Sequence, residues 1–117
     1  MLQGAVIVFV IGALGGLGLA SFVLRGQLAL WPLSILHALL GATGLVLTAL
    51  VVLGGGDAVP AHAGLALILL LVAALGGFFL ASYHVRKVPG PKAVVLIHAA
   101  VAATGVVLLA GGAFRLF

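Results

Sequence analysis

The chain has 117 residues, of which 66% are hydrophobic and only 5% charged. So few charges cannot cover the surface of a compact globule in water, and we therefore expect lipid to be the solvent. The formal net charge of +4 comes from cations scattered among the ends of apolar stretches, which excludes the continuous basic face of a nucleic-acid-binding protein.

Four stretches of the chain are apolar and close to the length of about 20 residues that a helix needs to cross a bilayer. In chain order they are residues 4–24, 33–53, 63–82 and 93–114, and none contains Asp, Glu, Lys or Arg. Short connections rich in Gly and Pro separate them. The sequence predicts an all-α fold, a polytopic membrane four-helix bundle whose first partner is the lipid bilayer.

The cations favour one side of the membrane. Four of the five lie in the first and third connections: Arg25, Arg86, Lys87 and Lys92. The second connection instead holds Asp57, the only acidic side chain, and Arg115 lies near the chain end. Under the positive-inside rule, the first and third connections are cytoplasmic and both termini lie outside. We expect this membrane to be the inner membrane of a bacterium or archaeon.

The two halves of the chain are related by a shift of 61 positions. The shift aligns His37 with His98 and Arg25 with Arg86, and it superimposes two Gly-Gly pairs. Of 56 overlapping positions 18 are identical, where chance matching of such Ala-rich and Leu-rich halves gives roughly 7. We predict two parallel repeated hairpins, residues 1–56 and 62–117, within one membrane domain.

The aligned histidines are the main candidates for a functional site, because a histidine inside a membrane span is costly unless it has a partner. Helical geometry places His37 and His98 at equal depth, about one and a half turns inside the cytoplasmic boundary. Small residues follow them on the same helix faces, at Gly41, Gly44, Ala102 and Gly105. This pattern suits a flat macrocycle between the second and fourth helices, with the two imidazoles as metal ligands.

We therefore expect one haem b near the cytoplasmic face, with its propionates directed toward the cations of that side, Arg25, Arg86, Lys87 and Lys92. With its four spans and the paired His37 and His98, the chain resembles the small membrane b-type cytochromes of the cytochrome b561 kind and the haem-bearing anchor subunits of respiratory complexes. The resemblance implies electron transfer between a quinone pool and a partner protein. It also suggests a subunit of an oxidoreductase complex, without catalytic activity of its own and with quinone as a further cofactor.

The other two histidines are weaker candidates. His62 and His84 lie at the ends of the apolar stretches, and the repeat aligns them with Met1 and Val23 rather than with histidines. The cytochrome b561 core carries two haems on two matched pairs, whereas this chain has one matched pair. His84, on the same side as His98, could replace one ligand or approach a haem edge or a quinone.

Two other classes of function are compatible with the sequence. Small residues also let membrane helices pack closely, and a histidine can form a hydrogen bond across such an interface. The chain could therefore be a cofactor-free structural subunit of a larger membrane complex. Parallel helical repeats also occur in transporters, which allows a small transporter or channel component. In all of these cases we expect other membrane subunits, or further copies of the chain, as partners.

Overall fold

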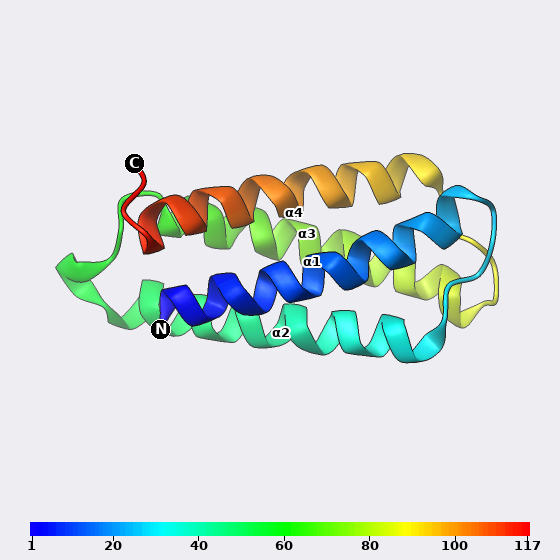
Figure 1. Cartoon of the computed structure of the whole chain (residues 1–117), viewed down its shortest axis with the longest axis horizontal. Coiled ribbons are helices and arrows are strands. Elements are labelled where there is room, and N and C mark those ends of the chain that lie inside the picture. Colours follow the sequence, from blue (N-terminus) through cyan, green and yellow to red (C-terminus); the bar gives the residue numbers. More distant parts are fainter.

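The computed structural model describes residues 1–117, apart from the side chain of Asp57. Its helices are α1 (Leu2–Leu24), α2 (Trp31–Gly54), α3 (Ala63–Val85) and α4 (Lys92–Ala113), with a short 3₁₀ helix η1 (Gly56–Ala58) between α2 and α3. All four α-helices are long and apolar enough to span a membrane. The predicted all-α membrane four-helix bundle is confirmed, and the protein is an integral membrane protein (Figure 1).

Proline marks the start of two helices. Pro32 lies in the first turn of α2, and Pro91 precedes α4 in an extended conformation. Proline fits the first turn because the amide N–H that it lacks would have no helical partner there. With Pro32 in its first turn, α2 begins at Trp31, before the predicted start at residue 33. Separately, α3 continues to Val85, past the end predicted at residue 82. The prediction counted the apolar run alone, whereas the helices continue into the polar boundary.

The four helices form a ring in which each packs against two neighbours. The most extensive contacts are within the hairpins α1–α2 and α3–α4, and α1–α4 and α2–α3 complete the ring. Helices α2 and α4 are therefore diagonal to each other. The bundle is 46 Å long, close to the roughly 40–45 Å thickness of a bilayer with its headgroups. The division into two repeated units, residues 1–56 and 62–117, stays a prediction.

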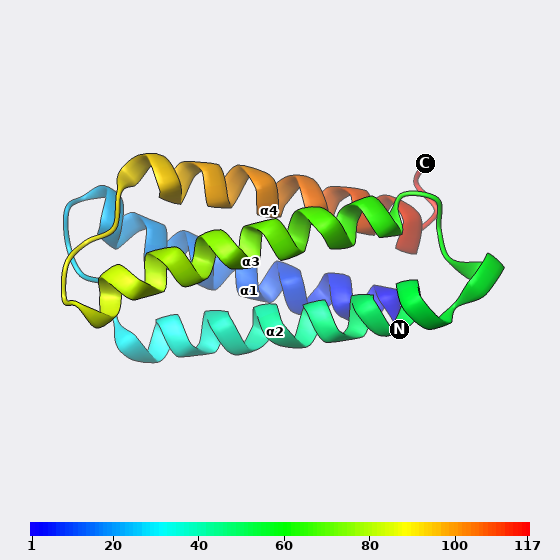
Figure 2. The same cartoon turned by 180° about the vertical axis from the view of Figure 1, so that it is seen from behind.

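The two ends of the bundle differ in their chemistry. Figures 1 and 2 show both termini at one end, which we call the terminal end, together with the α2–α3 connection. The opposite end, formed by the α1–α2 and α3–α4 connections, is called the cationic end. It carries Arg25, Arg86, Lys87 and Lys92.

Large buried side chains are concentrated toward the terminal end. The main hydrophobic cluster consists of Ala5, Val6, Phe9, Ala63, Ala66, Leu70 and Leu109. Toward the cationic end, Val95 is the only buried hydrophobic side chain larger than alanine among the described residues. Gly12 and Ala73 are buried at the boundary between the two halves. The half of the bundle near the cationic end therefore has few buried side chains.

Helices α1 and α3 end with equivalent backbone turns. After α1, Gly26 has φ +72° and the next amide donates to the Phe22 carbonyl. After α3, Lys87 has φ +58° and the next amide donates to the Tyr83 carbonyl. Both are Schellman caps, in which the left-handed residue is usually glycine. Only the second hairpin places a residue with a Cβ in this conformation.

Lys87→Gly is expected to stabilise the protein by roughly 0.5–1 kcal/mol, because glycine adopts the left-handed conformation without the steric cost of a Cβ. Detergent-solubilised protein titrated with SDS and followed by circular dichroism would measure the change. Lys87→Ala is the matched control, since it removes the charge but keeps the Cβ. Equal stabilisation by both variants would attribute the gain to charge and contradict the backbone explanation.

Candidate functional site

The structure brings His37 and His98 together across the diagonal of the bundle. Each is the seventh residue of its helix, counted from Trp31 in α2 and from Lys92 in α4. Their ring centroids are 6.3 Å apart and their ring planes are inclined at 78°. The two side chains that the repeat aligns are therefore close neighbours.

Each imidazole is held by a backbone carbonyl of the preceding helix. The Nδ1 of His37 lies 2.8 Å from the Gly12 carbonyl oxygen, and the Nδ1 of His98 lies 2.7 Å from that of Ala73. A carbonyl oxygen only accepts, so Nδ1 carries the hydrogen in both rings and donates it. Nε2 is then the nitrogen that keeps a lone pair. Gly12 and Ala73 are themselves related by the 61-residue shift, so the two hydrogen bonds are equivalent.

The repeated Gly-Gly pairs provide the space in which these rings lie. A Cβ added at Gly16 would lie 2.9 Å from the Cε1 of His37, and one at Gly77 would lie 3.2 Å from that of His98. A side chain at either position would push against the imidazole. The sequence reveals the glycine pairs through the repeat, but their role becomes clear only when the rings are seen resting on α1 and α3.

The second ring nitrogens form no hydrogen bond with the described residues: each histidine is bonded through Nδ1 alone. Both side chains are half-buried, and no polar side-chain atom described in the structure is fully buried without a partner. Both Nε2 atoms are therefore accessible at the surface of the chain. A ring nitrogen within a membrane span gains considerably from a partner, so these two atoms are where a bound group would attach.

The small residues predicted to flank a cofactor have different surroundings. A Cβ at Gly44 would lie 2.7 Å from the ring of Phe9, and one at Gly105 would lie 2.8 Å from Cγ of Leu70. The space above these two glycines is thus used by α1 and α3 for packing within each hairpin. A Cβ at Gly41 would have no neighbour within 4 Å, and Ala102 is half-buried.

The predicted arginines lie at the rim of the cationic end. Arg25 and Arg86 are both exposed, and each donates from Nε to the carbonyl of a serine four residues earlier, Ser21 or Ser82. These hydrogen bonds hold each arginine against the end of its own helix. The structure does not bring either guanidinium into contact with the histidine rings.

The two remaining histidines lie at opposite ends of the bundle. His84 stacks on Trp31 of α2, with ring centroids 3.9 Å apart and planes inclined at 12°. His62 lies at the terminal end, 6.1 Å from the ring of Phe117. The repeat gives no signal for the Trp31–His84 stack, because it aligns these residues with Lys92 and Val23. Among the described residues, no group of three or more His, Cys, Asp or Glu could hold a metal ion.

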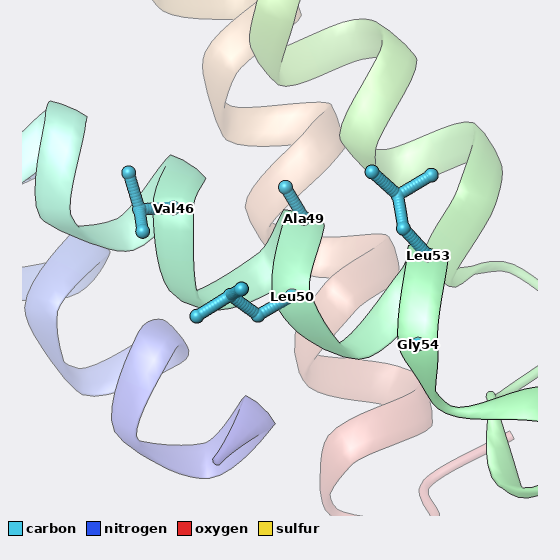
Figure 3. Close-up of a pocket in the computed structure, with 5 residues that line it drawn as sticks. All are labelled: Val46, Ala49, Leu50, Leu53 and Gly54. Carbon is cyan, nitrogen blue, oxygen red and sulfur yellow. The ribbon is translucent and has the colours of Figure 1, made fainter.

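Two shallow hollows on the outer face of α2 are apolar. The larger, of about 360 Å³, is lined by Val46, Ala49, Leu50, Leu53 and Gly54 (Figure 3). The other, of about 300 Å³, is lined by Leu39, Ala42, Thr43, Val46 and Leu47. Most of these side chains are exposed on the outside of the bundle, where lipid chains would cover them. Neither hollow includes a histidine.

Comparison with known protein families, curated proteins and solved structures finds no match for this chain. The fold and the site together define an integral membrane four-helix bundle with one pair of neighbouring histidines. The functional conclusion therefore depends on the geometry of this pair.

Proposed function

We propose that the chain binds one haem b between His37 and His98 and acts as an electron-transfer or anchor subunit of a membrane complex. The observation that carries this proposal is the pair of imidazoles 6.3 Å apart, each fixed through Nδ1 with Nε2 left for a ligand. The macrocycle would lie between α2 and α4, in the half of the bundle near the cationic end.

The distance between the rings fits two imidazoles on one metal. Two metal–nitrogen bonds of about 2.0 Å, together with the half-widths of two imidazole rings, give roughly 6 Å between the ring centroids. Histidine ligands in proteins usually donate their other ring N–H to a carbonyl or carboxylate, which orients the ring and makes the ligating nitrogen more basic. His37 and His98 both have this arrangement through Gly12 and Ala73.

A haem suits this donor set better than a bare metal ion. Structural and catalytic zinc sites take three or four protein ligands, whereas the described residues offer two histidines here. A porphyrin supplies the other donors itself and needs only the two axial ligands. The half of the bundle near the cationic end, where few side chains are buried, would receive the macrocycle, with the open surface of Gly41 beside it.

Bound haem would supply one-electron redox chemistry, and the chain's own residues would orient the iron ligands and exclude water. By the positive-inside rule, the cationic end faces the cytoplasm and both termini lie outside, in a bacterial or archaeal inner membrane. A partner subunit would carry out the chemistry coupled to the electron, with a quinone pool as its source or acceptor.

Oxidised and dithionite-reduced absorption spectra of the purified protein supplied with haem would test the proposal. We expect a Soret band and the reduced α-band of haem b in the wild type, and loss of both in His37→Ala and in His98→Ala. Each variant removes one axial ligand of a pair. His62→Ala and His84→Ala, the same change elsewhere, should keep the wild-type spectrum. A wild type without a Soret band, or one unchanged by both ligand variants, would overturn the proposal.

A cofactor-free structural subunit is the second candidate, and a particular observation favours it. Phe9 packs over Gly44 and Leu70 packs over Gly105, so two of the small residues already serve helix packing. In this role His37 and His98 would link the helices of each hairpin through their Nδ1 hydrogen bonds alone. Reduced stability of the histidine variants in a protein that never takes up haem would favour this candidate.

A further inference from the structure

Among the described residues, no negative group lies at the cationic end. Four of the five cations lie there, whereas the only acidic side chain belongs to Asp57, in η1 near the terminal end. Because none of the described residues supplies an anion there, this end of the bundle is open to anions from its surroundings.

Two of these cations are held in equivalent positions by contacts with their own helices. The Nε of Arg25 donates to the Ser21 carbonyl at 2.8 Å, and its guanidinium carbon lies 5.3 Å from the Phe22 ring centroid. In the second hairpin, the Nε of Arg86 donates to the Ser82 carbonyl at 3.2 Å, and its guanidinium carbon lies 4.3 Å from the ring of Tyr83. We call these two groups the arginine hooks: Ser21, Phe22 and Arg25 in one, and Ser82, Tyr83 and Arg86 in the other.

The hooks leave the terminal amino groups of both guanidiniums available. Nε is occupied by the serine carbonyl, and among the described residues the only other hydrogen bond of either guanidinium is a long one of 3.5 Å from Arg86 to the Ser82 hydroxyl. Two terminal amino groups can donate in parallel to two oxygens of one phosphate. Because the backbone carbonyl and the aromatic ring already restrain each side chain, less conformational freedom would be lost when an anion binds.

The depth of the hooks matches that of lipid headgroups. Arg25 and Arg86 directly follow the last residues of α1 and α3, at an end of a bundle 46 Å long. A helix of 23 residues spans about 34 Å, slightly more than the roughly 30 Å hydrocarbon core, so the helix ends reach the headgroup region. Trp31, 45% exposed at the same end, belongs to a residue type that prefers this interface.

We propose that each arginine hook binds the phosphate of an anionic phospholipid headgroup, so that the chain holds two such lipids in the leaflet at its cationic end. This assigns Arg25 and Arg86 to lipid rather than to haem propionates. The inference depends on the two matched geometries and the unbalanced charge, and it holds with or without a haem.

Native mass spectrometry of the protein in detergent, supplied with phosphatidylglycerol, would count the retained lipids. The wild type should retain two, Arg25→Gln and Arg86→Gln should each retain one, and the double variant none. Arg115→Gln is the matched control, because it removes the same charge at the terminal end and should retain two. Circular dichroism would verify that each variant keeps the helical content of the wild type.

Three further measurements complete the test. Phosphatidylcholine, whose headgroup has no net charge, should be retained at least several-fold less than phosphatidylglycerol. Inorganic phosphate at the same concentration should not displace the lipid. The double variant Arg25→Lys/Arg86→Lys keeps the charge without the planar fork, and should retain less lipid than the wild type even where the Gln variants fail to fold.

Each of the opposite results would overturn the proposal. Equal retention of phosphatidylcholine would mean that the headgroup charge is not recognised, and displacement by inorganic phosphate would identify a soluble anion as the ligand. Wild-type retention by the double Gln variant would show that the arginines do not bind the lipid. Wild-type retention by the double Lys variant would mean that charge alone acts, without the hook geometry.

Discussion

Gly44→Ala is expected to destabilise the bundle by about 1–3 kcal/mol, the usual cost of forcing an extra methyl group into a packed interior. The new Cβ would lie 2.7–2.8 Å from three atoms of the Phe9 ring. Phe9 is buried in the main hydrophobic cluster between neighbouring helices, so its ring has little space into which it can move. The backbones of α1 and α2 would have to separate instead.

Gly41→Ala is the matched control on the same helix. A Cβ at Gly41 has no neighbour within 4 Å. Replacing glycine by alanine inside a helix stabilises the helix by up to about 1 kcal/mol through intrinsic helix propensity. The two variants should therefore change the free energy of unfolding in opposite directions. SDS titration of detergent-solubilised protein, followed by circular dichroism, would measure both. Equal stabilisation by the two changes would contradict the packing of Phe9 against Gly44.

The fold follows from the sequence because lipid imposes a simple requirement on a membrane span. Each stretch of about 20 apolar residues must satisfy its own backbone hydrogen bonds, so it becomes a helix. The helix ends are less predictable from hydropathy, since α2 begins at Trp31 and α3 runs on to Val85 through polar positions. Local backbone chemistry, such as Pro32 in the first turn of α2, fixes these ends.

The site could be predicted only in part, because a repeat identifies equivalent residues but not their neighbours. The 61-residue shift selects His37 and His98, which the structure brings together. Helical periodicity also placed Gly44 on the His37 face. The side chain that covers Gly44 is Phe9. Its identity depends on how α1 crosses α2, which the spacing of residues along α2 does not predict. The stack of His84 on Trp31 has no counterpart at the positions that the repeat aligns with them, so no sequence pattern predicts it.

If the proposed haem is bound, Gly16→Ala is expected to move the His37 ring and to lower haem affinity about 10-fold to 100-fold, the usual effect of disturbing a residue that orients a metal ligand. The added Cβ would lie 2.9 Å from Cε1 and 3.3 Å from Nδ1 of the imidazole. Nδ1 is the atom bonded to the Gly12 carbonyl at 2.8 Å. The ring cannot move away from the methyl group without lengthening that bond, so the ligand would lose its orientation as well as its position.

Haem titration followed by the Soret band would measure this effect, with Gly4→Ala as the control on the same helix, since a Cβ at Gly4 meets nothing within 4 Å. Gly77→Ala should act in the same direction but less strongly, because its Cβ lies 3.2 Å from the His98 ring. We expect the larger effect at Gly16 because its added Cβ would lie closer to the imidazole, at 2.9 Å rather than 3.2 Å. If Gly16→Ala left haem affinity unchanged, His37 would not be held in the orientation that ligation requires. If it lowered stability in a protein that takes up no haem, the glycine pair would serve the hydrogen bond between α1 and α2, as the structural-subunit candidate requires.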